Sequence, residues 1–199
     1  MTKVRRTQAE RRESTVARLL GATLETLAEN GYSKTTTIAV CRRAGLTQGA
    51  LFRYFPSRVA LIAAATDEVC RRHLALIAPA LAELVASEAD PIAALVITMR
   101  EATRTPEHAA WHEVMVAART DAELHALVAP TLKSFEQSLL EAIGDLGGAV
   151  ASAERAGTIM LSLMHLFDSE AVTVAVYGNP PLEADRIVWL TEMLRRELA

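Results

Sequence analysis

The side chains best suited to bind a polyanion lie between Thr35 and Arg58. This segment combines a run of three threonines, two adjacent arginines and a short stretch that begins with a glutamine. Its pattern predicts two short helices joined by a tight turn, with positive charge and hydrogen-bonding groups on one side. That arrangement is the shape of a helix-turn-helix reader of DNA.

The turn between these two helices is specified at several successive positions. The first helix should begin at Thr36 or Thr37, whose hydroxyl can accept a hydrogen bond from an unpaired backbone N–H. Gly45 permits a left-handed turn, Leu46 fills the corner, and Thr47 caps the next helix. We therefore expect helices over residues 36–44 and 48–54.

The second of these helices should present a polar face to solvent. Leu51 and Phe55 are four residues apart and should face the core. Pro56 stops the helix, because the residue before a proline is disfavoured in the helical region. The side chains left pointing outward are those of Gln48, Gly49, Phe52 and Arg53, with Tyr54 beside them.

A basic N-terminal part precedes an acidic remainder. Through Arg58 the chain holds eleven Lys and Arg residues against four Asp and Glu, a net charge of +7. The remaining residues hold ten bases and twenty acids, a net charge of −10. A cationic N-terminal part suits a polyanion, whereas the acidic remainder should be repelled by one.

The rest of the chain repeats the helical spacing of apolar residues. A helix precedes the turn segment, with a left-handed stop at Gly31, and Pro79 and Pro130 should bend two later helices. No segment alternates clearly between apolar and polar residues, so no β-strand is expected. The expected helices outside the turn segment span residues 7–30, 58–86, 91–104, 106–119, 122–146, 153–177 and 183–198.

Composition excludes several classes of protein. The chain is 51% hydrophobic, with sparse Gly and Pro, which indicates an ordered globular fold. No apolar run follows the basic residues 1–8, and no uninterrupted apolar segment reaches the roughly 18 to 20 residues that span a membrane. Cys41 and Cys70 lie far from any second Cys or His at metal-binding spacing. We expect a soluble, cytoplasmic protein with reduced thiols, no metal site and no cofactor.

Several short motifs occur in one register within residues 9–61. They are Asn30-Gly31-Tyr32, Thr35-Thr36-Thr37, Ala44-Gly45-Leu46-Thr47, Gly49, Leu51-Phe52 and Tyr54-Phe55-Pro56-Ser57-Arg58. With these motifs the segment resembles the DNA-binding domain of the tetracycline-repressor-like (TetR) family of bacterial transcription regulators. The resemblance implies an all-α fold of about nine helices. Residues 1–57 would form a three-helix, helix-turn-helix DNA-binding domain and residues 58–199 a helical effector-binding and dimerisation domain.

The resemblance also implies which side chains contact DNA. Thr36 and Thr37 look like the family's phosphate contacts. Gln48 looks like its base reader, because an amide at the start of the recognition helix can pair with N6 and N7 of adenine. Gly49 and Ala50 leave room for close approach and for a thymine methyl group. The full set of expected contacts is Thr36, Thr37, Arg43, Thr47, Gln48, Gly49, Ala50, Phe52, Arg53, Tyr54 and Arg58.

The sequence departs from the family pattern at a few of these positions. Phe52 stands where the family usually has Tyr, so the phosphate bond of that hydroxyl should be weaker or absent. Ile38 stands at an exposed position where some relatives carry a polar or basic base reader, so we expect no such contact. Arg53 could read a guanine or contact a phosphate, and phosphate is favoured because most side-chain contacts to DNA go to the backbone. Arg58 replaces the more common Lys and is a competent phosphate binder.

The last two helices are apolar around most of their circumference. Such a helix must be buried on more than one side. We expect these helices to pair with a second copy of the chain, since two-fold dimers suit palindromic DNA sites. Burial inside a single chain is the alternative. The expected interface residues are Ile159, Leu163, Phe167, Val174, Ile187, Leu190 and Leu194.

Methionine, tryptophan and histidine side chains could line an apolar effector pocket between facing helices. His108 and His112 are four residues apart beside Glu113, but no third ligand stands at a metal-binding spacing, so no metal site is expected. Core packing explains any one of these side chains equally well. The candidate pocket residues are Met99, His108, Trp111, His112, Met115, Met160, Met164 and His165.

No constellation of catalytic residues emerges. Asp168 and Glu170 do not share a helix face, no serine stands in a nucleophile turn, and no Gly-rich phosphate loop follows a strand, so no enzyme is expected. The sequence predicts a homodimeric, ligand-responsive repressor that binds a palindromic double-stranded operator and a small apolar effector. The alternative is a helical small-molecule-binding or sequestering protein whose basic N-terminal part meets RNA, membrane or an acidic partner.

Overall fold

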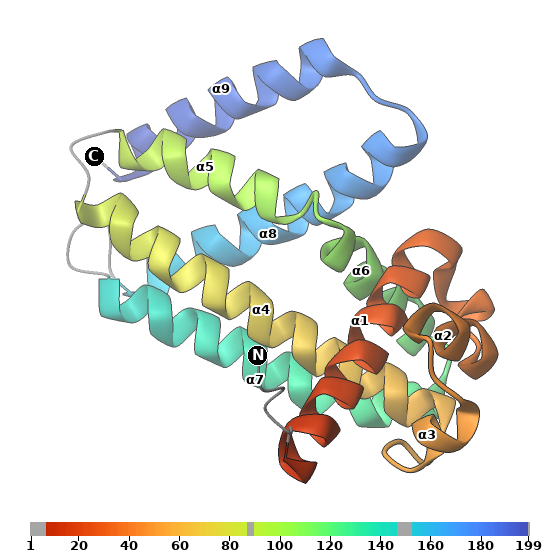
Figure 1. The fold of residues 1–199 in the computed structure, drawn as a ribbon. Coiled ribbons are helices and arrows are strands. Elements are labelled where there is room, and N and C mark those ends of the chain that lie inside the picture. Colours follow the sequence, from red (N-terminus) through yellow and green to blue (C-terminus); the bar gives the residue numbers. More distant parts are fainter. Residues whose placement is uncertain (1–6, 87–89, 147–152, 199) are drawn as a thin grey trace, which may run out of the picture. The chain divides into compact units, whose positions relative to one another are not determined.

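The computed structural model describes residues 7–86, 90–146 and 153–198, which form nine helices and no strand (Figure 1). The expected all-α class is confirmed. The helices are α1 (Gln8–Lys34), α2 (Thr37–Ala44), α3 (Gln48–Phe52), α4 (Arg58–Ala86), α5 (Pro91–Ala102), α6 (Pro106–Ala118), α7 (Ala122–Leu146), α8 (Ala153–Val176) and α9 (Pro180–Leu198).

The helix ends differ from the expected ones in a few places, each with a local cause. Gly31 has φ 77° and ψ 171°, a positive φ but not the left-handed helical conformation that was expected. The chain kinks there and makes a short further turn to Lys34. α9 begins three residues earlier than expected, because proline is tolerated in a first helical turn. The side chain of Asn179 accepts a hydrogen bond from the N–H of Leu182 at that end (3.3 Å).

The described residues group into two compact units. We call residues 7–69 and 109–131 the head unit, and residues 70–108 and 132–198 the body unit. Helices α4, α6 and α7 each contribute residues to both units. The functional division expected after residue 57 stays a prediction.

The head unit has an apolar core formed by α1, α2, α3 and the start of α4. The side chains that the helical spacing placed inward, including Leu51 and Phe55, are buried in it. Its members are Leu19, Ala22, Val40, Cys41, Ala44, Leu51, Phe55 and Leu61.

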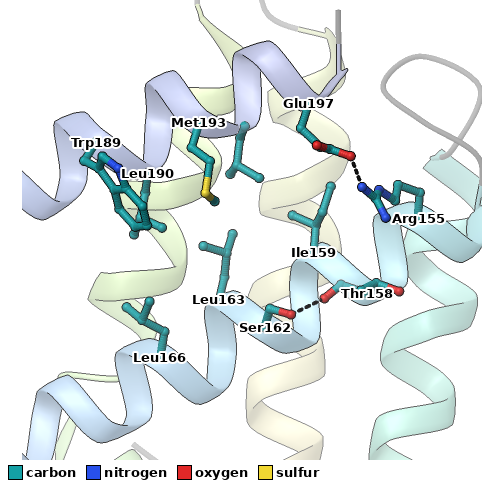
Figure 2. A pocket seen from close by; sticks show the side chains of 11 residues that line it. Arg155, Thr158, Ile159, Ser162, Leu163, Leu166, Trp189, Leu190, Met193 and Glu197 are labelled. Carbon is teal, nitrogen blue, oxygen red and sulfur yellow. Dashed lines mark hydrogen bonds and ion pairs between the residues drawn. The ribbon is translucent and has the colours of Figure 1, made fainter.

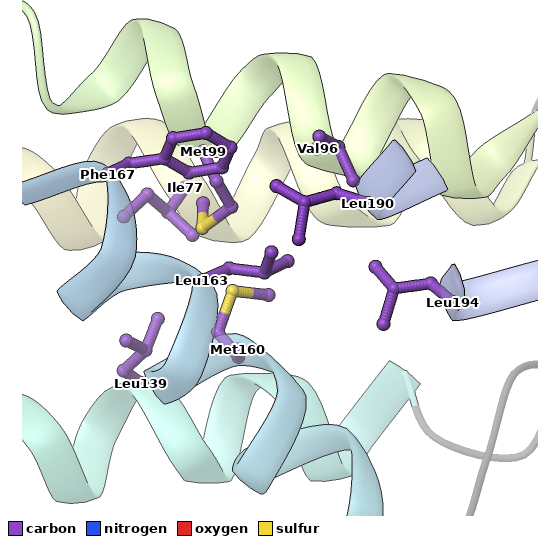
Figure 3. Packing of buried hydrophobic residues seen from close by; sticks show 9 residues of the cluster. All are labelled: Ile77, Val96, Met99, Leu139, Met160, Leu163, Phe167, Leu190 and Leu194. Carbon is purple, nitrogen blue, oxygen red and sulfur yellow. The ribbon is translucent and has the colours of Figure 1, made fainter. Parts of the chain in front are cut away.

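The body unit has a second apolar core, shown in Figure 3. It joins side chains of α4, α5, α7, α8 and α9, and two of the expected pocket residues, Met99 and Met160, are packed inside it. Its members are Ile77, Val96, Met99, Leu139, Met160, Leu163, Phe167, Leu190 and Leu194.

A partly buried cluster of charges, centred on the buried Glu170, joins α5, α8 and α9 within the body unit. The carboxylate of Glu170 accepts hydrogen bonds from Arg100 Nε (2.7 Å), Arg104 Nη2 (2.7 Å) and Arg186 Nη1. Glu183 accepts from Arg100 (2.8 Å) and Arg104 (2.9 Å). Burial opposes ionisation of Glu170, but the bonds from its three arginines outweigh burial and hold its pKa below the usual range.

A histidine pair lies in the same unit. The ring of His73 is 5.6 Å from that of His108 and 6.3 Å from that of Phe135, measured between centroids. His108 is bonded through Nε2 to Oδ1 of Asp168 (2.6 Å), whereas His73 Nε2 is buried without a hydrogen-bond partner. Burial, reinforced by the neighbouring His108 and opposed by Glu107, lowers the pKa of His73 to about 4. His73 is therefore neutral at physiological pH.

The segment Gly157–Val176 of α8 is long and apolar enough to cross a membrane by length and composition alone, with a mean hydropathy of 1.5. The segment is not the uninterrupted apolar run whose absence the sequence indicated. Asp168 and Glu170 interrupt its apolar run, and both are bonded to other helices of the body unit. Only 22% of the segment is buried within the chain. Several of its apolar side chains, such as Leu161 and Leu166, are half-buried, and Val172 and Val176 are exposed.

Candidate nucleic-acid interface

The turn between α2 and α3 has the geometry that its residues predict. The hydroxyl of Thr36 accepts a hydrogen bond from the N–H of Ala39 (3.1 Å), and that of Thr47 accepts from Ala50 (3.2 Å). Gly45 adopts φ 63° and ψ 39°, the left-handed conformation that a glycine reaches without strain. Side-chain caps therefore fix the start of both helices, and the left-handed Gly45 ends α2, whereas α3 ends at Phe52, two residues earlier than expected.

Arg18 of α1 also fixes this turn. Its guanidinium donates to the carbonyl oxygens of Ala44 (2.6 Å) and Gly45 (3.3 Å). Positive charge at the C-terminal end of α2 also complements the helix dipole. A Cβ at Gly45 would lie 3.2 Å from Arg18 Nη2, so the glycine also makes room for this contact. Sequence reasoning missed the role of Arg18 because its partners lie 26 and 27 residues away.

The polar face of α3 points to solvent. Gln48, Gly49, Phe52 and Arg53 are all exposed, and Tyr54 is half-buried. At the start of α2, Thr36 is exposed and Thr37 is half-buried, and Ile38 presents 65% of its surface. Of the other expected contacts, Thr47 is exposed and Ala50 is half-buried.

Gly49 leaves open space beside this face. A Cβ placed there would meet only the Thr47 hydroxyl oxygen, at 3.9 Å, which is ordinary van der Waals contact. Packing within the protein therefore does not require a glycine at this position. The absence of a side chain there would, however, allow another molecule to approach the backbone closely.

Two of the expected DNA contacts are occupied inside the head unit. Arg43 pairs with Glu29 and with Glu25 (3.2 Å) of α1, and the hydrogen bond from Arg43 lowers the pKa of Glu29. Arg58 donates to the carbonyls of Thr35 (Nε to O, 2.7 Å) and Tyr32. These bonds use part of the five N–H donors of each guanidinium, and direct contact of Arg43 and Arg58 with DNA stays a prediction.

The expected pocket residues do not line the cavity found in the body unit. That cavity, of about 320 Å³, lies between α8 and α9 and is walled by apolar side chains such as Leu163, Trp189 and Met193, with an Arg155–Glu197 ion pair (Figure 2). Among the expected residues, Trp111, His112 and Met115 belong to the head unit and the other five to the body unit. Met164 is half-buried and His165 is exposed. A single pocket formed by all eight residues stays a prediction.

Four of the expected dimer residues are buried within their own chain. Leu163, Phe167, Leu190 and Leu194 are at most 3% exposed and pack inside the body core, and their part in a dimer interface stays a prediction. Ile159, Val174 and Ile187 are half-buried. The apolar side chains that α8, α9 and their connection expose are Val172, Val176, Tyr177, Leu182, Val188, Trp189 and Met193.

The chain resembles known regulators in sequence. Residues 19–65 match the family model described as bacterial regulatory proteins, tetR family. The chain is 38% identical over 190 residues to the uncharacterized HTH-type transcriptional regulators Mb2936c of Mycobacterium bovis and Rv2912c of Mycobacterium tuberculosis. Each alignment covers 95% of this chain and 97% of the relative.

Solved structures share the fold over almost the whole chain. The transcriptional regulator SCO7518 from Streptomyces coelicolor superposes with a TM-score of 0.67 at 16% identity, covering 94% of this chain and 99% of its own. The multidrug binding protein EbrR, in complex with imidazole, gives a TM-score of 0.64 at 18% identity, covering 92% and 94%. NalD, the secondary repressor of the MexAB-OprM multidrug efflux pump in Pseudomonas aeruginosa, gives 0.60 at 22% identity, covering 96% and 98%.

Proposed function

The chain belongs to the TetR family of bacterial regulators and is a DNA-binding transcriptional regulator, and from this premise we propose that it is a cytoplasmic repressor. It binds a palindromic operator as a homodimer. A small, largely apolar molecule bound by the effector domain, residues 58–199, lowers the affinity of residues 1–57 for that operator. The description of NalD as a repressor and of EbrR as a multidrug binding protein supports this proposal by similarity.

The exposed face of α3 is the observation that carries the proposal. It places the amide of Gln48 at the N-terminal end of the helix, beside the open space at Gly49. An amide in this place can read adenine in the major groove, and the arginines of the basic N-terminal part can neutralise phosphates. Thr36, Thr37, Thr47, Arg53 and Tyr54 would contact the backbone around this reader.

Binding to DNA from the protein's own promoter region, measured at several salt concentrations, tests this function. We expect the logarithm of the affinity to fall linearly with the logarithm of the salt concentration. Gln48→Ala should reduce discrimination between operator and unrelated DNA by about 1 to 3 kcal/mol. Gln137→Ala, on the exposed face of α7, is the matched control and should change neither affinity. A protein that binds no duplex from this region at low salt would contradict the proposal.

Uncovered apolar surface on α8 and α9 supports the homodimer. Trp189 and Val188 each expose 58% of their surface, and Val172 and Val176 near the end of α8 expose 43% and 80%. Exposed apolar surface of this kind usually marks an interface. A C2 dimer would cover the same surface on both copies and would place two recognition helices on one palindrome.

The size of the protein in solution tests the dimer. We expect the mass of two chains by sedimentation or light scattering, and a monomer after the double substitution Val188→Lys and Trp189→Glu. Asp185→Lys, an exposed position on the same helix, is the control for added charge. A wild-type monomer at micromolar concentration would refute the dimer while leaving DNA binding by a single head unit open to measurement.

The effector part of the proposal requires a difference in affinity. A molecule that binds the operator-bound and free conformations equally shifts nothing, however tightly it binds. Footprints of the operator, repeated with small apolar compounds, should identify one that releases the protein. A compound that binds the protein without changing operator affinity would count against it as the effector.

A further inference from the structure

Tyr32, at the end of α1, is bonded to residues of three other helices or their ends within the head unit. Its backbone N–H donates to Oε2 of Glu113 on α6 (2.9 Å). Its hydroxyl donates to Oδ2 of Asp121, directly before α7 (2.7 Å). Its carbonyl accepts from the guanidinium of Arg58, the first residue of α4, which also lies over its ring at 4.1 Å. One residue thus ties α1 to the starts of α4 and α7 and to the side of α6.

The Asp121 carboxylate is held in place on both sides. Its other oxygen, Oδ1, accepts from the N–H of Leu124 in the first turn of α7 (3.0 Å). Hydrogen bonds from Leu124 and then from Tyr32 lower the pKa of Asp121. Burial and the bond to Asp121 raise the pKa of Tyr32. The hydroxyl is therefore protonated and donating, and the carboxylate is ionised and accepting, at physiological pH.

The kink at Gly31 is shaped for Glu113. The positive φ of 77° already disfavours any other residue there. In addition, a Cβ at Gly31 would lie 3.0 Å from Oε2 of Glu113, which is closer than such contacts normally come. The carboxylate of Glu113 occupies the space that a side chain at position 31 would need.

The same turn leads directly to the N-terminal end of α2. Thr35 is buried, its hydroxyl donates to the carbonyl of Gly31 (2.8 Å), and its carbonyl accepts from Arg58. The next residue, Thr36, caps α2. Any shift of the Gly31–Tyr32 turn therefore moves the start of α2, and with it the α2–α3 turn.

We propose that Glu113 and Asp121 are positioning residues for DNA recognition, acting through Tyr32 on the placement of α2 and α3. They lie outside residues 1–57, and as carboxylates they gain nothing from contact with DNA. Their charge weakens the attraction of the head unit for a polyanion. If Glu113 acted only through its charge, removal of the carboxylate would raise operator affinity. If it positions α2 and α3, removal should lower operator affinity.

The test compares operator DNA with unrelated duplex DNA of equal length. Glu113→Ala should lower operator affinity about two- to tenfold, the scale of one lost hydrogen bond at a solvent-exposed site, while affinity for unrelated DNA stays equal or rises. Glu113→Gln, whose amide oxygen can still accept from Tyr32 N–H, should restore most of the operator affinity. Tyr32→Phe should give a smaller loss of the same kind. Glu123→Ala, an exposed carboxylate nearby in sequence, should raise both affinities by the same small factor.

The proposal would be overturned if Glu113→Ala changed the affinities for operator and for unrelated DNA by the same factor, as Glu123→Ala is expected to do. If Glu113→Ala does not fold at the temperature of measurement, Tyr32→Phe and Glu113→Gln provide the same comparison.

If the wild-type protein binds no operator, the proposed function fails. Amide hydrogen exchange then tests separately whether Glu113 positions the start of α2. Backbone amides of residues 32–39 should exchange faster in Glu113→Ala than in Glu123→Ala. Identical exchange in the two variants would refute the positioning role.

Discussion

The head and body units use their polar side chains in different ways. In the head unit, the hydroxyls of Thr36, Thr47 and Ser57 each bond to a backbone N–H three residues further on. In the body unit, Glu170 is bonded to Arg100 and Arg104, 70 and 66 residues away, in the interior. The head unit thus caps α2, α3 and α4 locally and leaves a polar face outward, with Tyr32 as a long-range tie, whereas in the body unit Glu170 joins α5, α8 and α9.

Removal of the Glu170 carboxylate is the strongest test of this contrast. Glu170→Ala removes the shared partner of three partly exposed arginines, of which Arg100 and Arg104 keep Glu183. Removing the partner of such a group costs about 1 to 3 kcal/mol. We expect a loss of this size in the free energy of unfolding, measured by urea denaturation at constant protein concentration. Glu192→Ala, an exposed position of α9, should change it by less than about 0.5 kcal/mol. Equal effects would mean that this cluster of charges does not organise the body unit.

The buried His73 makes the body unit sensitive to acid. Its pKa of about 4 lies below the usual 6.5, so between these values the unfolded chain binds a proton that the folded chain does not. Stability should therefore fall as pH decreases from about 6.5 towards 4, by at most about 3 kcal/mol. Denaturation across this range should show a shallower pH dependence for His73→Leu than for wild type. Substitution of the exposed His165 by Gln should leave the slope unchanged, and a wild-type slope in His73→Leu would contradict the assignment.

In the head unit, Gly49→Ala separates stability from recognition. The added methyl group meets no obstacle in the protein, and Ala favours a helix over Gly by up to about 1 kcal/mol. If DNA approaches this position closely, the methyl group should weaken operator binding by about 1 kcal/mol or more. We therefore expect a higher melting temperature together with a lower operator affinity. Unchanged affinity would show that the space beside Gly49 is not used.

Phe52→Tyr should give the smallest effect. Phe52 is 47% exposed, so an added hydroxyl can reach a phosphate without disturbing the core. We expect operator affinity to increase by about 0.5 to 1.5 kcal/mol, the worth of one hydrogen bond. The slope of affinity against salt should not change, because tyrosine adds no charge. A loss of affinity would indicate that the apolar ring itself contacts the DNA.

The head unit could be predicted well because its signals are local. The caps at Thr36 and Thr47, the left-handed Gly45 and the inward Leu51 all follow from residues within one or two helical turns. Gly31 was predicted only in part. A positive φ follows from glycine, but its ψ of 171° accompanies a hydrogen bond from the next N–H, of Tyr32, to Glu113, 82 residues after Gly31.

Long-range pairing explains what the sequence did not reveal. No local pattern connects Arg18 to Ala44, Glu113 to Tyr32, or His108 to Asp168. Periodicity identified α8 and α9 as apolar on several sides, but it does not say which side faces the chain's own core. Leu163 and Leu190 were therefore assigned to a dimer interface, and the structure buries them within the chain.

Both cysteines are buried, with Cys41 in the head unit and Cys70 in the body unit. Burial also raises the pKa of the Cys41 thiol, so little reactive thiolate is present at neutral pH. A thiol reagent can modify each site only when that part of the protein opens. The kinetics of labelling at the two positions would therefore measure the opening of each unit separately, without any engineered probe. Operator DNA that binds the folded head unit should stabilise it and so slow the labelling of Cys41.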